Sequence, residues 1–296
     1  MTLQIEAPQA TNYPRQPLDH LDALWVQIGG TLCNLTCSHC FVSSGPTNHN
    51  HPMMSRAEVA TRVGEALALG VKEVYFTGGE PFLHPQLLDV LEDTLPHVPC
   101  TVLTNGTLFS GARLGALARL TRAARYSLEI RVSLDGDRAE IHDAFRGAGS
   151  FARVIDGLVR CEAHGLLPIV TVTRTSGDDE AALRHRVWTM LRAVPLARPR
   201  IKLLPMFRLG REVERSGPPG PGESLAGVPQ DLVAAARLQC AGCRAVTARG
   251  IHVCPLLVEE PGGLIADRLD QALGDFELQH AACSTCFATG MTCANG

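Results

Sequence analysis

The stretch Leu24-Trp-Val-Gln-Ile-Gly-Gly-Thr-Leu-Cys-Asn-Leu-Thr-Cys-Ser-His-Cys-Phe41 places three cysteines directly after an apolar run that predicts a buried strand. Cys33, Cys37 and Cys40 follow the spacing CxxxCxxC, so three thiolates share one short loop. A [4Fe–4S] cluster usually has four cysteine ligands, and three would leave one iron without a protein ligand. This arrangement is unusual for an electron carrier and suits a cluster that binds a substrate.

Two other kinds of metal site fit the loop less well. A bacterial ferredoxin uses C-x2-C-x2-C followed by Cys-Pro, which the loop does not match. A structural zinc site needs four ligands, and His39 is available as the fourth. A zinc site would leave the other motifs of the chain unexplained. His49 and His51, in the turn-rich segment after the loop, are expected to face solvent.

Composition and charge exclude several classes of function. The chain has 296 residues, of which 45% are hydrophobic, so one large domain or two can form a core. The net charge of −3 gives no electrostatic reason to expect binding to nucleic acid or an anionic membrane. No apolar run approaches the roughly 18 residues of a spanning helix, and the first residues lack a signal-peptide pattern. We therefore expect a cytoplasmic protein.

The cysteine content predicts metal ligation. The chain contains eleven cysteines, and in a reducing compartment we expect such residues to bind metal and not to form disulfides. Cys100 and Cys161 stand alone in apolar segments, where a thiol packs as a small hydrophobic side chain. The other nine fall into three groups: Cys33, Cys37 and Cys40; Cys240, Cys243 and Cys254; and Cys283, Cys286 and Cys293.

Strands and helices are predicted to alternate along most of the chain. Strands are expected at 24–28, 73–77, 101–104, 127–134, 167–173 and 200–205, with helices at 56–69, 86–94, 112–124, 151–164 and 178–193. Such alternation predicts parallel βαβ units with right-handed crossovers. Six units are two short of the closed eight-fold barrel. The predicted fold class is therefore α/β, with an open, partial (β/α)6 TIM barrel.

Residues 210–230 are predicted to lack regular structure, because they contain Ser216-Gly-Pro-Pro-Gly-Pro-Gly222. This stretch marks a domain boundary. The predicted layout is an N-terminal arm at 1–23, the barrel at 24–205, a Pro/Gly-rich linker at 206–236 and a small cysteine-rich domain at 237–296.

Polar residues follow three of the predicted strands. Thr77-Gly-Gly-Glu-Pro81 ends the second strand, Asn105-Gly106 ends the third and Ser133-Leu-Asp-Gly136 ends the fourth. In parallel strands these ends lie on the same face, where two glycines let backbone approach a ligand closely. Asn-Gly and Asp-Gly are also common turn pairs, so a turn without ligand contact is the alternative at each position.

Together these motifs resemble the radical S-adenosylmethionine (radical SAM) superfamily. His142-Asp-Ala-Phe-Arg-Gly-Ala-Gly-Ser-Phe151 resembles a stretch found in members with a SPASM or twitch extension. The resemblance implies that an open iron of the [4Fe–4S] cluster chelates SAM, and that the reduced cluster cleaves it to a 5′-deoxyadenosyl radical. His39 stands where the family usually has an aromatic residue. The residues implied in cofactor binding are Gly78, Gly79, Glu80, Asn105, Ser133, Asp135 and Arg146, the last as a partner for the SAM carboxylate.

The C-terminal cysteines resemble a twitch or SPASM module with at least one auxiliary [4Fe–4S] cluster. The implied ligands are Cys240, Cys243, Cys254, Cys283 and Cys286, and Cys293 is a candidate hydrogen-atom donor. Two fully ligated clusters would need four thiolates each, so one is favoured, while two with open irons or other ligands stay an alternative. The first half also resembles the molybdenum-cofactor cyclase, whose auxiliary cluster binds substrate.

The resemblance implies an oxidoreductase that removes a hydrogen atom from a peptide or small natural product, with dehydrogenation, cross-linking or epimerisation as outcomes. The auxiliary cluster would transfer electrons or anchor the substrate. A flavodoxin- or ferredoxin-type reductant is the implied partner, with no nucleic acid or membrane. The alternatives are a cofactor-biosynthesis cyclase and, from another class, a non-catalytic Fe–S carrier or a zinc-stabilised binding protein.

Overall fold

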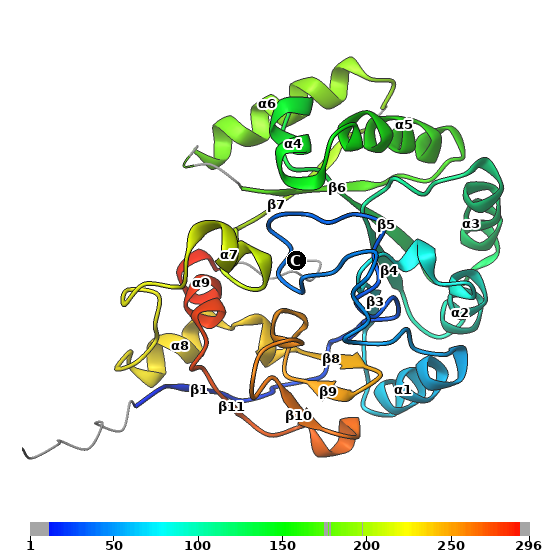
Figure 1. The fold of residues 1–296 in the computed structure, drawn as a ribbon. Coiled ribbons are helices and arrows are strands. Elements are labelled where there is room, and N and C mark those ends of the chain that lie inside the picture. The colour runs from blue at the N-terminus through cyan, green and yellow to red at the C-terminus, as the bar shows by residue number, and fades with distance from the viewer. Residues whose placement is uncertain (1–11, 175–176, 178, 197, 291–296) are drawn as a thin grey trace, which may run out of the picture.

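The computed structural model describes residues 12–174, 177, 179–196 and 198–290. Its main feature is a nine-stranded sheet with the strand order β10-β9-β8-β2-β3-β4-β5-β6-β7 (Figure 1). The strands from β2 to β7 run parallel to one another. They are the six strands that the sequence predicts: β2 (Ala23–Val26), β3 (Glu73–Phe76), β4 (Cys100–Thr104), β5 (Leu128–Ser133), β6 (Ile169–Thr173) and β7 (Arg200–Leu204).

Helices cover the outer face of this curved sheet, and the loop after β2 lies on its inner side (Figure 1). The first helix begins with a capping box, in which Ser55 accepts from the Glu58 amide and the Glu58 carboxylate accepts from the Ser55 amide. Within the barrel, the short helix α4 (Ala139–Arg146) is an addition to the predicted helices. The predicted α/β partial barrel is confirmed, with the helices α1 (Arg56–Ala68), α2 (Leu87–Thr94), α3 (Gly111–Ala123), α5 (Ser150–Ala163) and α6 (Glu180–Ala193).

Successive side chains on the strands divide between two apolar clusters. On β2, Leu24 and Val26 pack in the cluster between sheet and helices, whereas Ala23 and Trp25 pack on the inner side. This division follows from the period of two along a strand. On the inner side Trp25 stacks on Tyr75 of β3, with ring centroids 4.1 Å apart. The strands therefore present large side chains to the interior of the barrel, where the cysteine loop lies.

The C-terminal part of the chain continues the sheet of the barrel. Strand β8 (Cys243–Thr247) runs parallel to β2, and β9 (Gly250–His252) and β10 (Leu264–Ala266) extend the sheet in antiparallel fashion. The N-terminal arm contributes β1 (Arg15–Gln16), which pairs with β11 (Phe276–Glu277). One sheet thus contains strands from both the predicted barrel and the predicted C-terminal domain. The division of the chain into these domains stays a prediction. The region also holds short 3-10 turns and the helix α9 (Ala281–Thr289), and η1 (Pro81–Leu83) follows β3.

The prediction that residues 210–230 lack regular structure is wrong at one point. The helix α7 (Arg211–Ser216) lies there, and α8 (Gln230–Ala236) follows within the predicted linker. The Pro/Gly run begins only where α7 ends, at Gly217, whose φ of +82° suits a residue without a side chain. No helix in the described ranges is long and apolar enough to cross a membrane.

Candidate functional site

The cysteine loop packs directly against the end of β3. Gly79 donates its amide to the Gly30 carbonyl at 2.8 Å, and Glu80 donates to the Leu32 carbonyl at 2.9 Å. A Cβ atom on residue 79 would lie only 2.0 Å from the Leu32 carbonyl oxygen. Residue 79 must therefore be glycine, because the backbone that follows β3 lies in close contact with the backbone of the cysteine loop.

The three cysteine side chains of the loop converge on one cavity. Cys33 and Cys37 are buried and Cys40 is half-buried. Backbone amides point at two of the sulfurs: Leu35 donates to Cys33 Sγ at 3.4 Å and Ser44 to Cys40 Sγ at 3.3 Å. Burial raises the pKa of Cys33 to about 12, and because cysteine binds a metal as the thiolate, ligation would release its proton. Three soft ligands, two of them with backbone N–H donors, fit an iron–sulfur cluster.

The cavity encloses about 210 Å³ inside the barrel, and most of its surface is apolar, as in many cofactor sites. Its lining joins the cysteines to residues at the ends of successive strands. Of the residues predicted from the sequence, it includes Gly78, Gly79, Asn105, Ser133 and Arg146, which four separate segments contribute.

The Glu80 carboxylate has a different environment from the one predicted. It is fully buried and does not line the cavity. It accepts hydrogen bonds from the Phe82 amide at 3.0 Å, the Asn105 amide at 2.8 Å and the Thr104 hydroxyl at 2.7 Å. Its side chain therefore ties the end of β3 to the end of β4, and its backbone, not its carboxylate, contacts the cysteine loop.

Asp135 is also fully buried and lies behind the cavity lining. Its Oδ2 atom pairs with Nε of Arg146 and lies 2.9 Å from Nε2 of His39. Burial by itself raises the pKa of Asp135, but Arg146 and His39 outweigh it and hold that pKa below its usual range. Asp135 thus orients two cationic or polar groups at the cavity and does not face it itself.

A family model described as the radical SAM superfamily matches residues 28–180, which is more than half of the chain. The chain belongs to the radical SAM superfamily. The match runs from the cysteine loop to the start of α6 and contains every lining residue predicted from β3 to β5. Enzymes of this superfamily use a [4Fe–4S] cluster and S-adenosylmethionine.

Similar proteins match this radical SAM chain over part of their length. Mycofactocin maturase MftC of Mycobacterium ulcerans (strain Agy99) is 33% identical over 171 residues, 55% of this chain and 44% of that protein. GTP 3′,8-cyclase of Listeria welshimeri is 29% identical over 156 residues, 50% of this chain and 45% of that protein. The structure of Streptococcus suis SuiB bound to S-adenosylmethionine has a TM-score of 0.52 at 15% identity, covering 64% of this chain and 41% of SuiB. SuiB has also been solved with its precursor peptide SuiA. The chain spans less than half the length of these relatives.

Two further residues hold the radical SAM cysteine loop, and sequence reasoning missed both roles. Arg211, the first residue of α7, donates from Nε to the Cys37 carbonyl at 2.7 Å and from its Nη atoms to the Ser43 and Ser44 carbonyls at 2.9 and 2.6 Å. The sequence offers His39 as a substitute for an aromatic residue or as the fourth ligand of a zinc site, whereas in the structure it pairs with Asp135. No local sequence pattern marks Arg211, because its partners lie more than 160 residues away.

His51 corrects another expectation, that it faces solvent. Its side chain is buried, with Nε2 2.6 Å from Oε1 of Glu259 and its ring against that of His252. The C-terminal part of the chain covers the segment after the cysteine loop, which the linear pattern of turn residues does not reveal. His49 is exposed as predicted.

A second group of cysteines surrounds a small apolar cavity beside the radical SAM cavity. The four that line it are Cys240, Cys254, Cys283 and Cys286, although they come from three separate segments. Burial raises the pKa of Cys240 and of Cys283 to about 12. Leu256 lines both cavities, so a single side chain contributes to the wall between them.

Besides the four cysteines that line the small cavity, the C-terminal part of the chain has two more, Cys243 and Cys293. Cys243 is buried in β8, where its backbone is in register with Ala23, and it does not line the small cavity. Cys293 lies outside the described residues. Within the described ranges, no three His, Cys, Asp or Glu side chains converge on a point that could hold a single metal ion. Cluster thiolates, in contrast, bind separate irons.

Proposed function

We propose that this chain is a radical SAM enzyme that cleaves S-adenosylmethionine reductively and uses the 5′-deoxyadenosyl radical to remove a hydrogen atom from a peptide. The observation that carries the proposal is the shared cavity, where three cysteines of one loop meet the strand-end residues Gly78, Gly79, Asn105 and Ser133. When bound, the cluster supplies the electron for cleavage. We propose Cys33, Cys37 and Cys40 as its ligands.

The chain's own residues would orient the methionine part of the cofactor. Arg146 lines the cavity, and only its Nε atom is bonded to a protein acceptor among the described residues. Its remaining N–H groups are available for a carboxylate, which a guanidinium binds in bidentate fashion. Asp135 holds this guanidinium in place from behind, and His39 in turn pairs with Asp135. Gly78 and Gly79 let backbone approach the ligand, and Glu80 fixes that backbone.

We propose Cys240, Cys254, Cys283 and Cys286 as the ligands of one auxiliary [4Fe–4S] cluster. Four cysteines complete the usual ligand set, so no iron stays open for substrate. Full ligation favours electron transfer over substrate anchoring, and Leu256 would separate the cluster from the active cavity. Cys243 is left out of this set. The hydrogen-donor role of Cys293 stays a prediction.

The substrate class follows from the relatives together with this ligand set. Mycofactocin maturase and SuiB with its precursor peptide favour a peptide, on which dehydrogenation, cross-linking or epimerisation would be the outcome. The GTP cyclase relatives support cofactor biosynthesis as the second candidate. The fourth cysteine at the auxiliary site favours the peptide, because the cyclase-like arrangement needs an open iron. A flavodoxin- or ferredoxin-type protein is the proposed electron donor.

The test uses anaerobically reconstituted protein and measures iron together with 5′-deoxyadenosine formed from S-adenosylmethionine and dithionite. We expect about eight irons per chain, four for each cluster, and release of 5′-deoxyadenosine. Cys33→Ala should abolish that release, whereas Cys254→Ala should lose only the auxiliary irons. Cys243→Ala is the matched control and should keep about eight irons. Bound zinc without SAM cleavage would overturn the proposal.

A further inference from the structure

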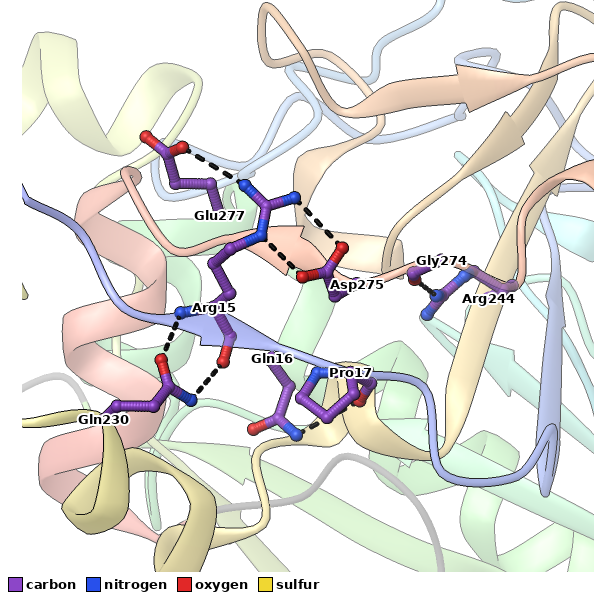
Figure 2. Close-up of polar contacts among 8 residues, drawn as sticks. All are labelled: Arg15, Gln16, Pro17, Gln230, Arg244, Gly274, Asp275 and Glu277. Atoms are coloured by element: carbon purple, nitrogen blue, oxygen red, sulfur yellow. Dashed lines mark hydrogen bonds and ion pairs between the residues drawn. The ribbon is translucent and has the colours of Figure 1, made fainter.

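Arg244 is a buried cation in the C-terminal cysteine region. It follows Cys243 on β8 and is 1% exposed. Its Nη1 atom donates to the carbonyls of Cys240 at 3.0 Å and Cys243 at 2.8 Å. Nε donates to the Ala272 carbonyl at 2.6 Å. Nη2 donates to the Gly274 carbonyl at 2.9 Å, which Figure 2 shows. One guanidinium therefore joins both ends of the turn that carries Cys240 to the segment before β11.

Every acceptor that the described part of the chain offers to this guanidinium is a neutral carbonyl oxygen. No carboxylate of the described residues forms an ion pair with Arg244. Carbonyl groups satisfy its N–H donors but leave its charge uncompensated, and a buried charge without a counter-charge is destabilising. Of the proposed cluster ligands, Cys240 accepts a hydrogen bond from Arg244 through its carbonyl, and the thiols of Cys240 and Cys254 both interact electrostatically with the guanidinium.

The N-terminal arm fixes one of the carbonyls that bind Arg244. Asp275, the residue after Gly274, accepts from Arg15 at 2.6 and 3.1 Å (Figure 2). The side-chain amide of Gln230 holds the backbone of Arg15. Its Oε1 atom accepts from the Arg15 N–H at 2.8 Å, and its Nε2 atom donates to the Arg15 carbonyl at 2.6 Å. The Gly274 carbonyl therefore lies in a segment that the arm anchors, and the guanidinium position does not depend on one loop alone.

We infer that Arg244 is a positioning residue for the auxiliary cluster: it supplies the counter-charge to the thiolates and raises the reduction potential of the cluster they hold. The inference rests on the proposed auxiliary site and adds that Arg244 sets the potential at which this site takes up an electron. A positive charge close to the cysteines favours the reduced state, which carries one more negative charge, and net charge is one of the factors that set cluster potentials. Hydrogen bonds to the Cys240 and Cys243 carbonyls also hold the ligand turn in place.

The test isolates the auxiliary cluster by replacing Cys33, Cys37 and Cys40 with alanine, so that iron and EPR signals report on one cluster. In that background Arg244→Gln removes the charge, and Arg244→Lys keeps it. Arg268→Gln is the matched control, because Arg268 is an exposed cation of the same region that pairs with Asp270. The measurements are iron per chain and the midpoint potential from an EPR-monitored redox titration.

For Arg244→Gln we expect the equilibrium constant of reduction to fall about tenfold, a 59 mV negative shift for a one-electron couple. Arg244→Lys should restore most of the midpoint potential, and Arg268→Gln should leave it unchanged. If Arg244→Gln does not fold, Arg244→Met also removes the charge while keeping a side chain of some length. It is compared with Arg15→Met, which loosens the Gly274 segment without changing the buried charge, and only Arg244→Met should lower the midpoint potential. Iron loss with an unchanged potential would overturn the charge role. Absence of about four irons in the alanine background would instead refute the auxiliary cluster itself.

Discussion

Gly79→Ala tests whether the cysteine loop needs a residue without a side chain at the end of β3. A Cβ atom there would lie 2.0 Å from the Leu32 carbonyl oxygen and 3.0 Å from the Cys33 nitrogen, whereas ordinary contacts begin at 3.4 Å. Both neighbours are backbone atoms, so no side-chain rotation relieves the clash. The loop must therefore move away from β3, and Cys33 moves with it.

The size of the effect follows from what this movement breaks. The hydrogen bonds from Gly79 to Gly30 and from Glu80 to Leu32 cross the junction. Two hydrogen bonds at about 0.5–1.5 kcal/mol each and an overpacking term of about 1–3 kcal/mol predict a loss of about 2–6 kcal/mol in the free energy of unfolding. The displaced thiol should also reduce iron loading at the three-cysteine site.

The assay is urea unfolding of the metal-free, reduced protein by circular dichroism, followed by iron analysis after reconstitution. Gly64→Ala is the control: residue 64 is exposed in α1, and nothing lies within 4 Å of its added Cβ. Alanine there should stabilise the helix by up to about 1 kcal/mol. If Gly79→Ala unfolded at the same urea concentration as the parent and bound as much iron, the argument from backbone contact would be refuted.

Three further variants test other contacts of the site. Arg211→Met removes charged hydrogen bonds to the cysteine loop and should lower iron loading at that loop. Arg208→Met is the control, because Arg208 is a half-buried arginine of the same segment that pairs with Glu223, and it should not lower iron loading. Equal iron loading in the two variants would contradict the role of Arg211. Asp135→Asn leaves the largely buried Arg146 without its carboxylate partner. Urea unfolding should therefore show a loss of about 3–5 kcal/mol in the free energy of unfolding, and equilibrium dialysis should show weaker binding of S-adenosylmethionine. Burial lowers the pKa of His252 to about 4 from 6.5, so unfolding takes up a proton between these values and stability is lost as pH falls. Between pH 7 and pH 5 this histidine should account for a loss of about 2 kcal/mol in the free energy of unfolding. His252→Gln should therefore flatten the pH dependence of the urea midpoint, and an unchanged slope would contradict the role of His252.

The sequence by itself determined the barrel and the type of chemistry at its first site. Apolar runs, helix periodicity and the Ser55 capping box are local patterns, and local patterns predict the elements that form. Parallel strands then bring their carboxyl ends to one edge, which is why Gly78, Asn105 and Ser133 could be assigned to a common cavity before the fold was known. The spacing of Cys33, Cys37 and Cys40 likewise required only one short loop.

Only the tertiary structure decided which polar and cysteine side chains meet. It turned the Glu80 carboxylate away from the cavity, buried His51, and selected Cys254 over Cys243 for the second cysteine cavity. It also placed Arg244 beside those cysteines without a carboxylate partner in the described ranges. The physical reason is that these contacts join segments far apart in the chain, where burial and hydrogen-bond geometry choose the partners, and sequence spacing carries no information about either.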